Sequence, residues 1–244
     1  MAGNGAIETF EVERKYAVSS RAELPGSPAF TAVGLRLIEP ESFTLEAIYF
    51  DTPDAALGLQ RVAVRKRVGG KDEGWHMKLK GADGSRELVW PLAETMPDGL
   101  LREIVDRIGK HDTDRLIAVA TMRTLRTIVR VWRDAGVSGV SALAPSPAPA
   151  PASAADALGA NGTTGSPEQP GEWLIELADD RVVATNALSG EERSWREWEA
   201  ELAPGASLEL LELVEPLLIG AGAERVRGTS KLQRAMGRPS DGAS

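Results

Sequence analysis

Short runs in which apolar and charged residues alternate dominate the first part of the chain. Residues 9–18 form the first run, and the alternation has the two-residue period of a β-strand. Turn-forming residues such as Gly69-Gly70 and the 82–85 segment separate later runs and indicate hairpins. We therefore expect an antiparallel sheet, with further strands over residues 45–50, 63–68, 74–79, 86–91, 125–133, 173–177, 182–185 and 194–202.

A helical period appears in fewer places. Apolar residues recur at helical spacing over residues 100–108, and Gly109 ends the run. We expect a second short helix over 112–119 and a final amphipathic helix over 207–218, which Pro216 interrupts. Many strands with few helices predict an α+β fold.

Residues 142–171 differ in composition from the rest of the chain, being rich in Pro, Ala, Ser and Gly. Such a segment buries too little apolar surface to offset its ordering entropy, so we expect it to be disordered. We favour a hairpin-loop insertion over a domain linker, because neither half holds enough apolar strands for its own sheet. The cost of loop closure also grows slowly with length. We therefore expect one domain over residues 1–244, with its core at 8–237.

Composition narrows the chemistry. The 244 residues include no Cys and only two His, which excludes thiolate and His-rich metal sites and leaves a hard cation held by carboxylates. The net charge of −8 argues against general nucleic-acid binding, and no apolar run approaches the roughly 20 residues of a membrane span. The start of the chain does not have the pattern of a secretion signal. We expect a cytoplasmic protein with a small-molecule partner, no nucleic acid and no membrane, and we leave a dimer open.

Charges within each alternating run fall on one face of the predicted strand. For any single run, the simpler interpretation is the solvated face of a half-exposed sheet. Taken together, the runs suit the inside of a curved or closed sheet, because apolar residues occupy the opposite faces. Like charges confined there repel, so we expect a complementary polyphosphate and metal. These faces carry Glu11, Glu13 and Lys15; Arg65 and Arg67; Lys78 and Lys80; and Glu197, Glu199 and Glu201.

Several charged runs extend into longer motifs. The first is EVERK at 11–15, a weak signal alone. It is followed by IYFDTPD at 48–54, VRKR at 64–67, WHMKLKG at 75–81, SRELVWPL at 85–92, LRTIVRVW at 125–132, LIELADD at 174–180, WREWEAEL at 195–202 and TSKLQRAMG at 229–237. In this order they resemble the CYTH superfamily, also called triphosphate tunnel metalloenzymes, whose N-terminal motif is Glu-x-Glu-x-Lys.

The resemblance implies an eight-stranded antiparallel β-barrel-like tunnel with surrounding helices. It also implies metal-dependent hydrolysis of a triphosphate, and we favour inorganic tripolyphosphate, cleaved to pyrophosphate and phosphate. Thiamine triphosphatase, nucleoside triphosphatase and class IV adenylyl cyclase activities remain alternatives, as does a non-catalytic polyphosphate-binding module. The number of carboxylates in the motifs favours an enzyme over a binding module, since binding alone needs cations.

The resemblance further assigns roles to residues of this sequence. It implies Glu11, Glu13 and Lys15 as catalytic residues. For the acid after Glu176, strand parity favours Asp180, with Asp179 as the alternative if a bulge intervenes. We expect His76 to be structural. The implied triphosphate-binding cations are Lys15, Arg65, Arg67, Lys78, Lys80, Arg86, Arg126 and Lys231. The implied ligands of Mg²⁺ or Mn²⁺ are Glu11, Glu13, Glu176, Asp180, Glu199 and Glu201, with Glu197 a weaker member of the set.

Overall fold

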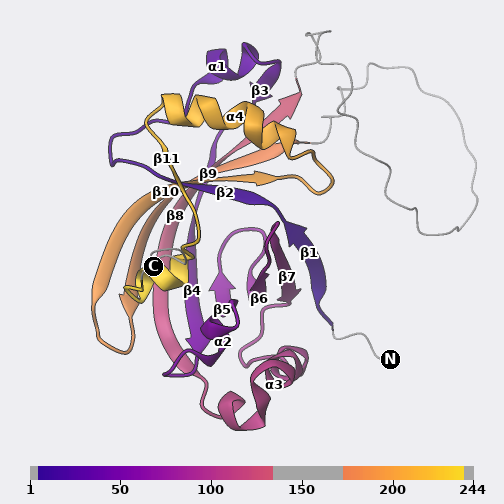
Figure 1. Cartoon of the computed structure of the whole chain (residues 1–244), viewed down its shortest axis with the longest axis vertical. Coiled ribbons are helices and arrows are strands. Elements are labelled where there is room, and N and C mark those ends of the chain that lie inside the picture. The colour runs from indigo at the N-terminus through magenta and orange to yellow at the C-terminus, as the bar shows by residue number, and fades with distance from the viewer. Residues whose placement is uncertain (1–4, 134–172, 239–244) are drawn as a thin grey trace, which may run out of the picture.

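The computed structural model describes residues 5–133 and 173–238, and the expected insertion at 142–171 lies outside them. The described residues form one antiparallel sheet (Figure 1), whose hydrogen-bonded order is β1-β7-β6-β5-β4-β8-β9-β10-β2-β11, with β3 beside β8. The strands are β1 (Ile7–Glu11), β2 (Glu13–Ala17), β3 (Leu35–Leu37), β4 (Glu41–Asp51), β5 (Val62–Val68), β6 (Gly74–Lys80), β7 (Ser85–Trp90), β8 (Ile117–Arg133), β9 (Ile175–Asn186), β10 (Glu192–Leu202) and β11 (Glu224–Val226).

The N-terminal segment joins the two edges of this sheet. β1 pairs with β7 at one edge, whereas β2 pairs with β10 near the other, and only Val12 separates β1 from β2. The hydrogen-bonded path is therefore not closed, but the covalent chain crosses the gap. If β1 and β2 are counted as one strand and the three-residue β3 and β11 are set aside, eight long strands remain. The expected α+β, barrel-like tunnel is confirmed.

Five helices lie around the described sheet: α1 (Ser27–Thr31), α2 (Ala56–Leu59), α3 (Asp98–Thr113), α4 (Glu209–Gly220) and α5 (Lys231–Ala235). Figure 1 shows α1 and α4 at one end of the molecule and α3 at the other. Within the described residues, no helix has the length and apolar character needed to cross a membrane.

Apolar contacts hold the helices to the outer faces of the strands. Leu211, Val214 and Leu218 of α4 are buried in one cluster with Tyr16 and Trp198 of the sheet. Burying a side chain such as leucine contributes roughly 1.5–3 kcal/mol, so this cluster fixes the end of the tunnel where β2 and β10 pair. A second cluster under α2 and α3 fixes β5, β6 and β7.

Three local predictions need correction. Gly109 has a non-helical conformation that divides α3, as expected, but the short helical part after it ends at Thr113 and does not cover 112–119, because β8 begins at Ile117. The strands expected at 173–177 and 182–185 are one strand, since Asp179 and Asp180 pair with arginines on opposite faces of β9 instead of forming a turn. Pro216 does not interrupt α4, whose buried leucines continue on both sides of it.

Candidate functional site

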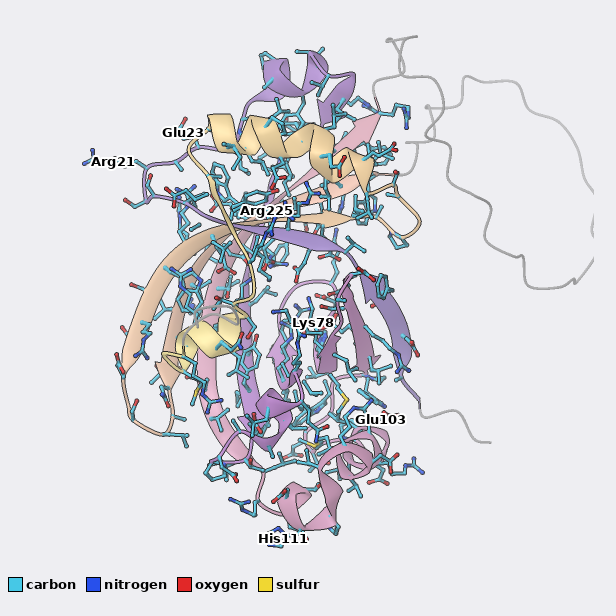
Figure 2. All side chains as sticks on the ribbon, in the orientation of Figure 1. Arg21, Glu23, Lys78, Glu103, His111 and Arg225 are labelled. Atoms are coloured by element: carbon cyan, nitrogen blue, oxygen red, sulfur yellow. The ribbon has the colours of Figure 1, made fainter. Side chains whose placement is uncertain are left out.

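The inner faces of the strands enclose a cavity of about 1160 Å³. Alternation along each strand selects the side chains that reach it: His76, Lys78 and Lys80 from β6, and Glu199 and Glu201 from β10. Lys78 lies in the middle of the sheet in Figure 2, far from His111 at the outer end of α3.

The cavity collects nearly all of the residues that the motifs single out. The six acids implied as metal ligands all line it, whereas the weaker candidate Glu197 lies beside the lining, against Lys231. Every cation expected to bind phosphate lines it except Arg86. The lining therefore includes Glu11, Glu13, Glu176, Asp180, Glu199 and Glu201 together with Lys15, Arg65, Arg67, Lys78, Lys80, Arg126 and Lys231.

Arg86 lies outside the cavity, contrary to the expectation that it binds phosphate. Its side chain is 48% exposed and forms an ion pair with Glu8. The reason is strand parity, because the neighbouring Glu87 takes the inward position and is buried. The same parity separates the two aspartates of β9. Asp180 lies inside, whereas Asp179 pairs with Arg196 at 2.7 Å on the other face.

One group of acids in the cavity is matched by cations. Lys231 Nζ lies 2.9 Å from Asp180, 2.7 Å from Glu197 and 2.6 Å from Glu199. Arg126 pairs with Asp180 and Glu199, each at 2.6 Å, and Lys15 also pairs with Glu199. We call these residues the balanced cluster, since three carboxylates face three cations: Asp180, Glu197, Glu199, Lys15, Arg126 and Lys231.

Pairing sets the ionisation of the balanced cluster. Burial opposes the charge of Glu199, but Lys15, Lys231 and Arg126 outweigh it and hold its pKa well below the ordinary value. The pKa of Asp180 is lowered in the same way, by Lys231 and Arg126. These carboxylates are therefore ionised across the neutral range.

A second group carries more negative charge than its cations balance. Lys78 pairs with Glu11 at 2.7 Å and with Glu13 at 2.9 Å, and Glu201 lies directly across from Glu13 in the β10–β2 register. Glu176 lies across from Glu201 on the other side, in the β9–β10 register. We call Glu11, Glu13, Glu201 and Lys78 the surplus cluster, because its three acids have one lysine of their own; Glu13 also lies 3.3 Å from Lys15, which Glu199 of the balanced cluster shares.

Crowding shows in the pKa values of the surplus cluster. Burial, together with the charges of Glu11 and Glu13, raises the pKa of Glu201 to about 8. Burial and a hydrogen bond to Glu87 raise the pKa of Glu11 to about 7. For Glu13, Lys15 and Lys78 outweigh burial and lower the pKa to about 2. An added cation would therefore be bound most favourably here.

A metal fits one of the two clusters better than the other. Asp180, Glu197 and Glu199 offer carboxylate oxygens within 4.8 Å of one another, which is compact enough for an ion. However, the ammonium of Lys231 already lies within 2.9 Å of an oxygen of each of the three, so its positive charge occupies the position that a metal ion would take. The surplus cluster has oxygen donors and uncompensated charge, as Mg²⁺ and Mn²⁺ require. Charge therefore favours the row of Glu176, Glu201 and Glu13, with Glu11 beside it. Distance favours the other cluster, because among the described residues only Asp180, Glu197 and Glu199 bring three carboxylate oxygens within 4.8 Å of one another.

Sequence reasoning missed Glu87 as part of the site. Its Oε1 accepts a hydrogen bond from Arg65 at 3.2 Å and lies 3.2 Å from His76 Nδ1. His76 is fully buried and its Nε2 lies 2.9 Å from the carbonyl oxygen of Asp72, so it supports the lining, as expected of a structural residue. Burial lowers the pKa of His76 to about 4. The alternation in SRELVWPL contained the signal, since only one of Arg86 and Glu87 can face inward.

The expected repulsion among the lining cations is largely absent. Arg65, Lys78 and Arg126 each have a carboxylate partner within 3.2 Å. Repulsion persists at Arg67, where burial and the charge of Arg65 lower the pKa to about 9. Most lining cations thus have carboxylate partners within the protein, and an incoming anion would exchange with these carboxylates.

The chain is similar in sequence to a known domain family and to a bacterial protein. The CYTH domain family matches residues 9–140. An uncharacterized protein of Mycobacterium tuberculosis, found in two strains, is 29% identical over 246 residues, which cover 95% of this chain and 41% of that protein. The chain therefore spans about 41% of the length of these relatives.

One solved structure shares the fold at low identity, and a second gives a lower score. A putative adenylate cyclase from Bacillus halodurans superposes with a TM-score of 0.51 and 18% identity, covering 93% of this chain and 97% of that chain. A putative adenylyl cyclase from Hippeastrum, described as having a dominant triphosphatase activity, gives a TM-score of 0.48 and 15% identity, covering 95% and 98%.

Proposed function

The chain belongs to the CYTH domain family, and from that premise we propose that it hydrolyses inorganic tripolyphosphate to pyrophosphate and phosphate with Mg²⁺ or Mn²⁺. One observation carries the proposal: a single cavity holds a row of arginines and lysines beside a carboxylate cluster with surplus charge. Cations suit a polyanion, and surplus carboxylates suit the hard metal that accompanies it.

Phosphate binding would proceed by exchange of partners. Arg65, Lys78 and Arg126 now donate to carboxylates across the cavity. Phosphate oxygens would take over these hydrogen bonds, and the guanidinium fork of arginine suits two such oxygens at once. Carboxylates released in this way would add to the charge available for a metal.

Glu13, Glu201 and Glu176 would hold the metal, which would neutralise phosphate oxygens when bound. Glu11, with a pKa of about 7, is the carboxylate best suited to accept a proton from water at neutral pH. The water oxygen bonds to the terminal phosphorus, and the phosphoanhydride P–O bond breaks with its electron pair passing to pyrophosphate. Lys15 and Arg126 would hold the charge of this leaving group.

The lining favours a free polyphosphate over a nucleotide. Among the described residues that line the cavity, Tyr49 is the single Phe, Tyr or Trp side chain, and its hydroxyl accepts a hydrogen bond from Arg65 at 3.4 Å. Proteins that bind bases commonly stack them on aromatic side chains. The cavity supplies charge for phosphates and little surface for a base.

Phosphate release from tripolyphosphate, ATP and thiamine triphosphate tests the proposal, each with and without Mg²⁺ or Mn²⁺. We expect tripolyphosphate to be turned over fastest and only with metal. Glu13→Gln serves as the inactive control, and Glu8→Gln, which changes an exposed acid outside the cavity, as the matched active control. Turnover of ATP or thiamine triphosphate alone would contradict the choice of substrate. Binding of tripolyphosphate without any release would indicate a binding module.

A further inference from the structure

Both ring nitrogens of His76 contact oxygen atoms, and the two oxygens belong to different elements. Nδ1 lies 3.2 Å from Oε1 of Glu87 on β7, and Nε2 lies 2.9 Å from the carbonyl oxygen of Asp72 in the β5–β6 turn. The ring is fully buried, and a buried polar side chain is costly unless its polar atoms have partners. Two partners on separate elements therefore fix both the position and the orientation of this ring.

Each partner of His76 also holds one arginine of the cavity. Glu87 Oε1 accepts a hydrogen bond from Nη2 of Arg65 at 3.2 Å, and the carbonyl oxygen of Asp72 accepts one from Nη2 of Arg67 at 3.2 Å. The Asp72 carboxylate adds an ion pair with Arg67. His76 lies directly across from Arg65 in the β5–β6 register. One imidazole thus connects the partners of two successive arginines on the inner face of β5.

The Nε atoms of these arginines remain available to a ligand. Nε of Arg65 and Nε of Arg67 are buried and have no hydrogen-bond partner among the described residues. Both side chains line the cavity. Buried N–H groups without a partner are rare and unfavourable, so two of them beside one cavity favour an anion that accepts their hydrogen bonds. Such binding depends on the orientation of each guanidinium, because its donors form a rigid planar fork.

We propose that His76 is a positioning residue for phosphate binding: through Glu87 and the Asp72 carbonyl, it sets the orientation of Arg65 and Arg67 before the ligand arrives. The inference rests on the proposed function, because both arginines belong to the proposed phosphate site. Both ring nitrogens already have partners, so His76 acts through the arginines and not on the ligand itself. Donors that are held in place bind more tightly than mobile ones, since less conformational entropy is lost on binding.

Two amide variants separate the two ends of the ring. The amide nitrogen of His76→Asn takes the place of Nδ1 and can donate to Glu87, whereas that of His76→Gln takes the place of Nε2 and can donate to the Asp72 carbonyl. His76→Leu fills the space and removes both contacts. His111→Leu changes an exposed histidine at the outer end of α3 and is the matched control.

Calorimetric titration of tripolyphosphate in EDTA measures binding without turnover, on the full chain. We expect His76→Leu to raise Kd about five- to tenfold, and His76→Asn and His76→Gln to raise it about two- to fourfold, as for the loss of two hydrogen bonds or one. His111→Leu should leave Kd unchanged. The same Kd for His76→Leu and the parent protein would overturn the proposal.

Double variants show whether His76 acts through the arginines. His76→Asn loses the contact that serves Arg67, so it should have no further effect on Kd when Arg67→Ala is already present. His76→Gln should likewise have no further effect when Arg65→Ala is present. Exchanging the two backgrounds should give additive effects. A merely structural role would weaken binding by the same factor in every background, and that result would overturn the proposal.

NMR of the arginine side chains in the ligand-free protein separates this inference from the proposed function. The Nε–H signals of Arg65 and Arg67, assigned by their loss in Arg65→Lys and Arg67→Lys, report how firmly each guanidinium is held. His76→Leu should broaden both signals, and His111→Leu should broaden neither. Unchanged signals in His76→Leu would overturn the positioning role even if tripolyphosphate is hydrolysed. Broadened signals support that role even if the parent protein releases no phosphate, an outcome that would contradict only the proposed function.

Discussion

Glu199 and Glu201 lie two residues apart on the inner face of β10, yet their ionisation differs greatly. Glu199 belongs to the balanced cluster, where Lys15, Lys231 and Arg126 hold its pKa well below the ordinary value. Glu201 belongs to the surplus cluster, where burial and the charges of Glu11 and Glu13 raise its pKa to about 8. The neighbouring strands, and not the residue type, decide which carboxylates remain available to a metal.

The acids of the lining therefore differ in role between the two clusters. In the balanced cluster the protein supplies its own cations, so we expect removal of one partner to destabilise the fold. In the surplus cluster the charge is left for a metal to neutralise. Variants of the balanced cluster should therefore lower the melting temperature. Variants of the surplus cluster should mainly lower kcat, and one of them should raise the melting temperature.

Metal removal should give the largest effect. We expect EDTA to abolish phosphate release and Mg²⁺ or Mn²⁺ to restore it. Ca²⁺ should not, because it prefers longer bonds and more ligands. The fold should persist in EDTA, since the balanced cluster needs no metal. Phosphate release and thermal melts on the same samples check this. Full turnover in EDTA would show that the surplus cluster needs no metal for activity.

Neutralising a surplus acid should come next. Glu13→Gln and Glu11→Gln should each lower kcat at least about 100-fold, equivalent to about 2.7 kcal/mol, with a smaller effect on folding. Steady-state kinetics and melting temperatures on the same preparations measure both. A large loss of melting temperature with unchanged kcat in the folded fraction would move these acids to a structural role.

Breaking the balanced cluster should affect stability. Lys231→Met keeps much of the side-chain volume and leaves Asp180, Glu197 and Glu199 short of a cation. Leaving buried charge uncompensated costs about 3 kcal/mol or more, or a fall in melting temperature of about 6–12 °C. Arg234→Met changes a more exposed cation of the same helix and is the control. Equal melting temperatures for the two variants would contradict the assignment.

Neutralising Glu201 should stabilise the metal-free protein at high pH. Between the ordinary pKa of 4.5 and the folded value of about 8, the folded protein holds a proton that the unfolded chain has lost. Stability from this group therefore falls as pH rises through that range. Glu201→Gln removes the fall, so its melting temperature should exceed that of the parent by about 2–4 °C at about pH 8.5 and by less at about pH 5. A larger gain in melting temperature at about pH 5 than at about pH 8.5 would contradict this prediction.

Arg86→Ala should have the smallest effect. Arg86 pairs with Glu8 outside the cavity, and exposed pairs contribute little. We expect its affinity for tripolyphosphate to change less than about twofold, whereas Arg65→Ala should weaken binding about tenfold or more. Calorimetric titration of both variants decides whether the cavity boundary is correctly placed.

Much of the fold was predictable from alternation, because period-two runs and hairpin turns mark most strands. The continuity of β9 was not. Asp179 and Asp180 resemble a turn in isolation, and only Arg196 and Arg126, on other strands, make them favourable within a strand. The short α5 was missed for a different reason. Ser230 and Gln233 form a capping box that the sequence contains, but five residues are too few to show a helical apolar period.

For the site, the motifs and strand parity predicted fifteen cavity residues, and thirteen of them line the cavity, Arg86 and Glu197 being the exceptions. The signal for Arg86 and Glu87 was present but not used: Arg86 shares its strand face with the apolar Leu88 and Trp90, which pack outside the cavity, so Glu87 faces inward. The split into balanced and surplus clusters depends on strand register, which joins Glu201 to Glu13 and Arg126 to Asp180. Register is a long-range property that a single run of sequence does not contain.

The crossing of the N-terminal segment from one sheet edge to the other bears on how the chain folds. β1 pairs with residues 85–89 and β2 with residues 197–201, so the first strand to be synthesised must wait for nearly the whole chain before it is fully paired. Contacts between such distant residues slow folding, because the chain must lose loop entropy before they form. We therefore expect EVERK, which carries Glu11, Glu13 and Lys15, to take its final place late in folding, and the surplus cluster to form in the same step.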